Sequence, residues 1–304
     1  MRGINAAQSR IGNRINKQIC VGGEIKYKME IEELLEISTA LRDSIRSYIA
    51  ETADYGEIIV RRAQDVTRKI DMFAERELER ELASRNYCAR IISEELGDHV
   101  YPKGGDPEFT LIFDPIDGST NAILGIPLFC SSIAYSPNVD HVTFDNLQAS
   151  VVATIYGKTY YAEKGSNAFV DGKKLPRDFK GKTKPIFSIY TYGAESIPES
   201  LIQFQKGAKK VIFRVLGSIA IEICLVAEGV IDAVMDVRGL ISGYDIAGAA
   251  LILKEAGGIV TDSGGEKLRS EVGQMQNIDL VAALEPEMYR KMLDTLSSKK
   301  TDMA

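Results

Sequence analysis

The chain has few of the residues that carry many catalytic and zinc-binding sites. Its 304 residues include only two histidines, His99 and His141, and four cysteines that never form a C-x-x-C pair. So few histidines leave little material for a Ser-His-Asp arrangement or a histidine-rich metal cluster. Scattered cysteines argue against a zinc site and against the dense disulfide framework of a small secreted domain. Carboxylates must therefore carry any chemistry, and a reducing cytoplasm is the expected location.

Two further absences exclude whole classes of partner. No stretch approaches the roughly 18 consecutive apolar residues of a membrane helix, so we expect no membrane span. The 37 basic residues are outnumbered by 43 acidic ones, whereas a general nucleic-acid binder needs basic side chains to replace the counterions around phosphates. No nucleic-acid partner is therefore expected. A small anionic substrate is still allowed, because bound metal ions can outweigh a modestly negative surface.

Residues 1–28 differ from the rest of the chain. They contain six basic side chains against the single acid Glu24 and show little hydrophobic periodicity. We interpret them as a basic N-terminal extension that is loosely ordered, or as an over-extended start with Met29 as the functional beginning. An Arg-rich, acid-poor start is also typical of a transit peptide.

Hydrophobic spacing predicts two helices followed by a run of strands in the first half of the chain. Apolar residues recur every three or four positions over residues 30–55, which is typical of an amphipathic helix, and a second helix is expected at about residues 68–85. Gly157 and Lys158 are typical of a hairpin turn between two of the strands. Short apolar runs predict these strands at residues 88–93, 109–114, 129–135, 149–155 and 159–162.

From residue 185 the pattern changes to alternating strands and helices. We therefore predict a layered fold, with an α+β half over residues 29–184 and an α/β half over residues 185–304. Gly257 and Gly258 would end one of the helices. Strands are predicted at residues 186–190, 211–214, 231–236 and 278–283, and helices at residues 218–228, 245–256 and 287–296.

The most informative segment is D-P-I-D-G-S-T-N at residues 114–121, which follows an apolar strand. Two carboxylates at the end of a hydrophobic strand repel each other and lose hydration, which raises their pKa values unless cations keep them ionised. Their hard oxygen ligands favour magnesium, manganese or calcium over zinc, and magnesium commonly bridges carboxylates to a substrate phosphate. Asp114 and Asp117 are therefore candidate metal ligands.

The same segment also offers a phosphate site. Gly118, Ser119 and Thr120 can point backbone N–H groups at an anion if a helical turn begins there, and glycine lets the backbone approach closely. The plainer alternative is a strand that ends in an Asp-Gly turn, because these residues are common in turns. The complete octapeptide after an apolar strand favours the functional interpretation.

Three further acids are candidates for the same site. Glu94 directly follows the predicted strand at residues 88–93 and could reach the same end of the sheet. Asp71 lies about one turn into the second predicted helix. Asp245 opens a helix whose next residues are small enough for close packing, although the helix dipole also favours a carboxylate there as an ordinary cap.

Together these residues resemble the inositol monophosphatase superfamily, which includes archaeal-type fructose-1,6-bisphosphatases and related lithium-sensitive phosphatases. The resemblance implies an αβαβα sandwich similar to the sugar phosphatase fold, and a homodimer. It covers about residues 30–297. The family's elements are matched, in chain order, by residues 66–71 (V-T-x-x-D), 94–95 (an acidic pair), 114–121 (D-P-x-D-G-[ST]-x-N, in full) and 244–249 (W-D-x-A-x-A, with Tyr244 for tryptophan).

The resemblance also implies a mechanism and a set of residues. A water activated by Mg²⁺ would attack phosphorus in line without a phosphoenzyme. Each site would hold two or three Mg²⁺ ions, and Mn²⁺ could replace them. The implied catalytic residues are Glu94, Ser119 and Asp71, with Ser119 and the glutamate orienting the water. Gly118 and Ser119 would donate backbone N–H bonds to phosphate. The implied metal ligands are Glu94, Asp114, Asp117, Asp245, the backbone carbonyl of Ile116, and Asp71 for a weaker or water-bridged ion.

The substrate is predicted from two arginines and a loop. Arg238 falls where inositol-specialised relatives carry an acid, and its planar fork would suit a second phosphate, although a surface arginine in a loop would look the same. Arg214 is a weaker candidate for this task, and the backbone at Gly217 and Ser218 would face the sugar. We therefore predict activity on small phosphorylated sugars and polyols, namely fructose 1,6-bisphosphate and inositol 1-phosphate. A 3′-phosphoadenosine 5′-phosphate phosphatase is the alternative, and it would need an aromatic or apolar platform for adenine, which the sequence does not locate.

Two rival classes have sequence signs of their own. Haloacid-dehalogenase phosphatases carry a similar D-x-D-G-[ST] element whose first aspartate is a nucleophile. Here two residues, Pro115 and Ile116, separate the acids instead of one, which shifts the second side chain relative to the end of the strand. A non-catalytic phosphate-binding homologue would be expected to have lost an acid, and all five acidic positions are present.

Overall fold

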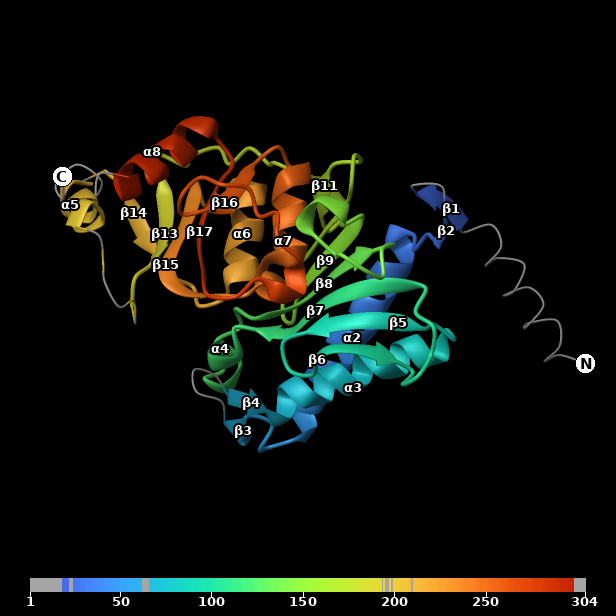
Figure 1. Cartoon of the computed structure of the whole chain (residues 1–304). Helices are drawn as coiled ribbons and strands as arrows, with labels where there is room; N and C mark the ends of the chain where they lie inside the picture. Colours follow the sequence, from blue (N-terminus) through green and yellow to red (C-terminus); the bar gives the residue numbers. More distant parts are fainter. Residues whose placement is uncertain are drawn as a thin grey trace, which may run out of the picture.

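A computed structural model of the chain describes residues 18–21, 24–61, 66–192, 194, 197, 199–208 and 210–297. Helices and two β-sheets alternate through these residues in five layers (Figure 1). The layers enclose three hydrophobic cores, one between each pair of outer helices and its sheet and one between the two sheets. This is the αβαβα sandwich that the sequence predicts, and the prediction is confirmed.

The larger sheet has eight strands in the order β12-β11-β10-β9-β8-β7-β5-β6. All neighbouring strands run antiparallel except β5 and β7, which run parallel, so the carboxyl ends of these two strands lie together. The eight strands are β5 (Ala89–Ser93), β6 (Gly97–Tyr101), β7 (Phe109–Asp117), β8 (Cys130–Ser136), β9 (Ala149–Thr154), β10 (Thr159–Glu163), β11 (Ala168–Val170) and β12 (Lys173–Lys174).

Two helices, α2 (Ile31–Glu51) and α3 (Lys69–Ser84), cover the outer face of this sheet (Figure 1). Both are amphipathic, and each buries the apolar stripe that its sequence spacing predicts. In α2 the stripe consists of Leu34, Ile37, Leu41 and Ile45, all with no exposed surface.

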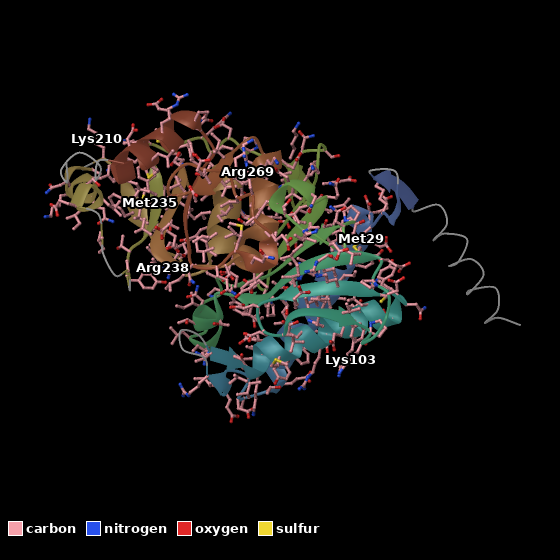
Figure 2. The ribbon with its side chains drawn as sticks, in the orientation of Figure 1. Met29, Lys103, Lys210, Met235, Arg238 and Arg269 are labelled. Carbon is pink, nitrogen blue, oxygen red and sulfur yellow. The ribbon has the colours of Figure 1, made fainter. Side chains whose placement is uncertain are left out.

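The smaller sheet has five strands in the order β14-β13-β15-β17-β16. β13 pairs in parallel with β14 and β15, whereas β17 pairs antiparallel with β15 and β16. Two helices pack on its outer face around a core that includes Met235 (Figure 2). The strands are β13 (Ile186–Tyr190), β14 (Ile212–Arg214), β15 (Ala233–Ile241), β16 (Ile259–Asp262) and β17 (Ile278–Ala283), and the outer helices are α5 (Glu199–Gly207) and α8 (Pro286–Ser297).

The central layer consists of α6 (Ile219–Glu228) and α7 (Gly243–Glu255), which lie between the two sheets (Figure 1). Both helices are apolar on nearly every side because each faces a sheet on both flanks. A Cβ added at Gly248 of α7 would lie 2.4 Å from Ser132 Oγ of β8. The small residues that follow Asp245 therefore pack closely against the large sheet, as predicted.

The remaining elements are short. β3 (Ile58–Arg61) and β4 (Val66–Arg68) pair, α4 (Ser119–Ile123) follows β7, and η1 (Phe144–Asn146) and η2 (Val272–Gln274) are single 3-10 turns. The predicted basic extension at residues 1–28 lies largely outside the described residues. Part of it is more regular than predicted, since β1 (Gln18–Val21) and β2 (Glu24–Tyr27) form an antiparallel hairpin.

The chain passes from the large to the small sheet between β12 and β13, where the predicted boundary at residues 184–185 falls. Both sheets share the central helices, so the division into two halves stays a prediction. Across the described residues, none of the helices combines the length and the apolar character that a membrane crossing requires.

Candidate active site

A β-bulge in β7 sets the directions of the two aspartates in the 114–121 segment. Asp114 pairs with Ser132 and Asp117 with Cys130, so two residues of β7, Pro115 and Ile116, stand opposite one residue of β8. In a regular strand, side chains three positions apart point to opposite faces of the sheet. The extra residue of the bulge places the Asp114 and Asp117 side chains on the same face. Ile116 accordingly lies in the core beneath α2 and α3, while Asp117 reaches the central helix α6.

Glu94, Asp114 and Asp245 converge at one end of the large sheet. Each offers a carboxylate oxygen, and the three oxygens all lie within 4.8 Å of one another. Glu94 follows β5, and its backbone N–H donates to Phe113 O at 3.2 Å, which places it beside Asp114 at the end of the parallel strand pair. Asp245 reaches the same point from the first turn of α7, so three elements far apart in sequence build this acidic cluster.

The acidic cluster requires a positive charge. Burial, together with repulsion from Glu94, Asp117 and Asp245, raises the pKa of Asp114 well above its usual value. Its Oδ1 is buried and has no hydrogen-bond donor among the described residues. Three crowded carboxylates with an unsatisfied buried oxygen match the hard oxygen ligands that divalent cations such as magnesium prefer. These residues therefore fit a divalent metal site.

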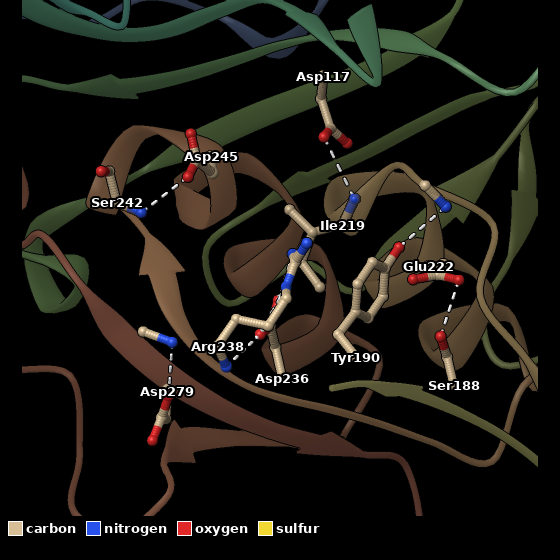
Figure 3. A network of polar contacts seen from close by, with 12 residues as sticks. Asp117, Ser188, Tyr190, Ile219, Glu222, Asp236, Arg238, Ser242, Asp245 and Asp279 are labelled. Carbon is tan, nitrogen blue, oxygen red and sulfur yellow. Dashed lines mark hydrogen bonds and ion pairs between the residues drawn. The ribbon is translucent and has the colours of Figure 1, made fainter. Parts of the chain in front are cut away.

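Asp245 also holds the start of its own helix. Its Oδ2 accepts the backbone N–H of Ser242 at 2.7 Å in a capping box (Figure 3). Tyr244, which stands in place of the family's tryptophan, packs partly against the central core, and burial raises its pKa to about 12. The capping interpretation of Asp245 and its place in the acidic cluster are therefore both correct descriptions of one side chain.

Asp117 is anchored to the first turn of α6. Its Oδ2 accepts the Ala220 N–H at 2.8 Å and the Ser218 hydroxyl, and its Oδ1 accepts the Ile219 N–H at 3.2 Å (Figure 3). Burial raises the pKa of this carboxyl, and these bonds to the ionised form oppose the shift. Asp117 therefore joins the large sheet to the central helix layer.

The turn after Asp117 has the conformation that the phosphate hypothesis requires. Gly118 is left-handed, with φ of 90°, and a Cβ there would lie 3.1 Å from the carbonyl oxygens of Gly217 and Leu128. Helix α4 begins at the next residue, Ser119, and Thr120 is exposed. A helical turn thus starts where we predict the N–H groups of Gly118, Ser119 and Thr120 to face an anion.

Asp71 lies at the start of α3. It is buried, and its Oδ2 accepts the Arg68 N–H at 2.7 Å in a capping box. The nearby Thr67 hydroxyl donates to Glu95, so β4 and the segment after β5 are linked. Asp71 does not belong to the group formed by Glu94, Asp114 and Asp245, and its predicted role with a weaker or water-bridged ion stays a prediction.

A model of the inositol monophosphatase family matches residues 27–300 of this chain. The chain belongs to the inositol monophosphatase family. It is accordingly a phosphatase, a phosphoric monoester hydrolase, as predicted. This membership decides against the haloacid-dehalogenase alternative.

Individual relatives of this inositol monophosphatase family member agree with the assignment. A fructose-1,6-bisphosphatase/inositol-1-monophosphatase from Methanothermobacter thermautotrophicus is 33% identical over 258 residues, covering 82% of this chain and 90% of that protein. A bifunctional NADP phosphatase/NAD kinase from Methanococcus maripaludis is 29% identical over 277 residues, covering 86% of this chain but only 48% of that protein. A solved structure of a hypothetical Pyrococcus horikoshii protein with similarities to inositol-1 monophosphatase is 26% identical, with a TM-score of 0.69, and covers 87% of this chain and 96% of that chain.

The two predicted phosphate-binding arginines have different surroundings in this family member. Arg214 is exposed at the end of the edge strand β14, and its Nη1 donates to Phe213 O at 2.8 Å. Arg238 lies in the small-sheet half (Figure 2), and its Nε and Nη2 donate to the buried Asp236 carboxylate, Nη2 at 2.6 Å. Asp236 therefore uses most of the fork that we predict for a second phosphate, and this role stays a prediction.

Arg238 also lies close to two aromatic rings. Its guanidinium lies 4.4 Å from the ring centroid of Tyr190 and 4.6 Å from that of Tyr192. Tyr192 is 59% exposed, and the Tyr190 hydroxyl accepts the Gly217 N–H at 3.0 Å. The exposed ring of Tyr192 thus lies next to Tyr190, which holds the loop whose backbone we predict to face the substrate, and the sequence did not indicate it.

Sequence reasoning also missed two buried glutamates behind the site, Glu75 of α3 and Glu222 of α6. Burial raises the pKa of each to about 7. Their sequence signal is an acid on the apolar face of a helix, as in Ile221-Glu222-Ile223. Such an acid must be hydrogen-bonded to be tolerated in a core, so it marks a polar contact worth seeking.

Proposed function

We propose that this chain is a Mg²⁺-dependent phosphatase of small sugar and polyol phosphates, acting on both fructose 1,6-bisphosphate and inositol 1-phosphate. The observation that carries the proposal is the convergence of Glu94, Asp114 and Asp245 within 4.8 Å. It agrees with the names of relatives such as the Methanothermobacter thermautotrophicus protein. We also propose a cytoplasmic homodimer, on the resemblance and cysteine usage alone.

The acidic cluster would hold Mg²⁺ together with the Ile116 carbonyl and Asp117. A carboxylate has about four lone-pair sites, and the bonds of Asp117 to α6 leave capacity on Oδ1 for a cation. Mg²⁺ bound there would neutralise phosphoryl charge and lower the pKa of water, which is the chemistry that phosphate ester hydrolysis needs. How many ions bind, and whether Asp71 holds one through water, are part of the proposal.

The protein's own residues would position the phosphate and the water. The N–H groups of Gly118 and Ser119, at the start of α4, would donate to phosphoryl oxygens. The Ser119 hydroxyl and the Glu94 carboxylate would orient the attacking water and accept its proton, with Asp71 supporting this side of the site. The loop at Gly217 and Ser218 would face the leaving group.

A substrate panel tests the proposal. We expect the purified full-length chain to release phosphate from fructose 1,6-bisphosphate and inositol 1-phosphate with Mg²⁺ and to lose this activity in excess chelator, because the acidic cluster cannot bind a phosphoryl group without a cation. Phosphate release is measured at a series of substrate concentrations, and activity should return on adding Mg²⁺ or Mn²⁺. Hydrolysis of both substrates that is undiminished by chelator would sink the metal mechanism.

The second candidate is phosphatase activity on a nucleotide, such as NADP or 3′-phosphoadenosine 5′-phosphate. Tyr192 favours it, because its exposed ring lies next to Tyr190, which holds the predicted substrate loop, and would serve as the aromatic platform that a purine needs. The similarity to a protein named as a bifunctional NADP phosphatase/NAD kinase supports the same candidate, although the chain spans about half of that protein.

We expect Tyr192→Ala to raise the KM for NADP about tenfold and to leave the KM for inositol 1-phosphate unchanged. Stacking of a base on an aromatic ring contributes about 1–3 kcal/mol, and 1.4 kcal/mol corresponds to a tenfold change in affinity. Steady-state kinetics on both substrates measure the effect. The matched control, Tyr192→Phe, keeps the ring and should behave as wild type. An equal change for both substrates would show that Tyr192 is no base platform.

A further inference from the structure

Glu222 is a buried acid that the proposed chemistry does not use. It lies in the first turn of α6, has no exposed surface, and is flanked in sequence by two isoleucines. A carboxyl group buried in such surroundings destabilises the fold unless hydrogen bonds compensate for its lost hydration. Its contacts therefore indicate what it holds in place.

These contacts lie directly beneath the loop at residues 215–218. Glu222 Oε1 accepts the Leu216 N–H at 2.6 Å and the Ser188 hydroxyl at 2.8 Å (Figure 3). Tyr190 lies two residues along β13 from Ser188. The Tyr190 hydroxyl in turn accepts the Gly217 N–H at 3.0 Å. Two successive amides of the loop are thus held, that of Leu216 by Glu222 and that of Gly217 by Tyr190.

The other side of the 215–218 loop contacts the proposed catalytic segment. Asn121 Nδ2 donates to Leu216 O at 2.7 Å and to Leu128 O at 2.7 Å. The Ser218 hydroxyl donates to Asp117, and a Cβ at Gly217 would lie 3.1 Å from Asn121 Nδ2. The loop is therefore fixed between Glu222 behind it and the 114–121 segment in front of it.

We propose that Glu222 is a positioning residue that sets the place of the 215–218 loop relative to the phosphate turn. The inference rests on the proposed function for its kinetic meaning, because the loop would face the leaving group. A carboxyl that fixes the Leu216 amide controls where the adjoining backbone of Gly217 and Ser218 stands. Removing it should therefore weaken substrate binding more than it slows the chemical step.

The test compares alanine and glutamine at this position. Glu222→Ala should raise the KM for inositol 1-phosphate about tenfold with a smaller change in kcat, since it removes the hydrogen bond to the Leu216 amide and the link from the loop to Ser188 of β13. Glu222→Gln keeps the oxygen that accepts from Leu216 and Ser188, so it should restore a KM close to wild type. Tyr190→Phe removes only the link to Gly217 and should have an intermediate effect, which provides a second variant if Glu222→Ala does not fold.

Glu228 supplies a matched control in the same helix. It is also fully buried, and it pairs with Lys158 at 2.7 Å and Arg177 at 2.7 Å, at the opposite end of α6 from the loop. Glu228→Ala should lower thermal stability but leave the KM unchanged. If Glu222→Ala and Glu228→Ala changed the KM equally, Glu222 would be only a general stabilising residue, and the inference would be overturned.

Hydrogen exchange separates this inference from the proposed function. In the full-length chain, Glu222→Ala or Tyr190→Phe should increase deuterium uptake in the peptide that spans residues 215–218, and Glu228→Ala should not. An inactive wild-type protein would refute the proposed function, but deuterium uptake in this peptide could still be compared between the variants. Unchanged uptake in that peptide for both loop variants would overturn the positioning role, whatever the activity.

Discussion

We expect Asp114→Asn to lower the rate of phosphate release about 1000-fold or more, which is a loss of about 4 kcal/mol of transition-state stabilisation. The same substitution should make the metal-free protein more stable. Asp114 is buried, and Glu94, Asp117 and Asp245 all raise its pKa by repulsion. An amide removes that repulsion at pH 8 but cannot replace a carboxylate as a metal ligand. We expect a gain of about 1–3 kcal/mol in chelator, measured by thermal unfolding alongside phosphate release.

Adding Mg²⁺ should make the wild-type protein more stable than Asp114→Asn, the reverse of the order in chelator. Wild-type protein should gain stability as Mg²⁺ is added, because a ligand that binds only the folded state stabilises it, whereas Asp114→Asn should gain little. The control is Asp145→Asn, which removes an exposed acid paired with Lys254 at 3.3 Å and should change neither quantity. A metal-free Asp114→Asn variant that is less stable than wild type would contradict the electrostatic account of the acidic cluster.

We also expect the stability of the metal-free protein to fall as the pH rises from about 5 to 8. Burial raises the pKa of Glu75 and of Glu222 to about 7 from 4.5, and that of Asp114 well above 3.8. Because the folded pKa exceeds the unfolded one, the folded state holds more protons in this window, and its stability is lost as the pH rises through the folded pKa. One glutamate shifted in this way accounts for up to about 3 kcal/mol.

Calorimetry at several pH values, in chelator and in Mg²⁺, measures this dependence. Mg²⁺ should reduce the fall, because it keeps the acidic cluster ionised, but it should not abolish it, because Glu75 and Glu222 lie outside that cluster. Glu222→Gln should remove the part of the pH-dependent loss of stability that Glu222 contributes. Metal-free stability that rises from pH 5 to pH 8 would exclude these raised pKa values.

Much of the fold follows from apolar spacing, because long elements with a single buried face repeat it clearly. The helix predicted at residues 30–55 is α2 (Ile31–Glu51), and the strand predicted at residues 278–283 is β17 (Ile278–Ala283). Two of the elements that were missed lack such a face. β6 (Gly97–Tyr101) is a polar edge strand with no buried residue, and β12 (Lys173–Lys174) is two exposed lysines.

The candidate site was predictable where acids follow strand ends and helix starts. Glu94 and Asp245 meet Asp114 because a parallel strand pair and one helix N-terminus share the same end of the sheet. The partners of Arg238 were not predictable. They depend on an irregular stretch of β15, between Asp236 and Ile241, where the guanidinium turns back onto Asp236 and contacts Tyr190 of β13 and Tyr192 just beyond that strand. The spacing of residues along the sequence does not predict that a side chain turns back in this way.

The extra residue of β7 limits how this motif can change during evolution. Deleting Pro115 or Ile116 would restore regular pairing with β8 and would leave Asp114 and Asp117 opposite Ser132 and Cys130, on the same face. Straightening the strand with both residues retained would instead turn Asp117 toward the core beneath α2 and α3, and its hydrogen bonds to α6 would be lost. Point substitutions alone therefore cannot convert this segment into one with a single residue between the acids. A lineage would have to alter the length and pairing of the strand in one step.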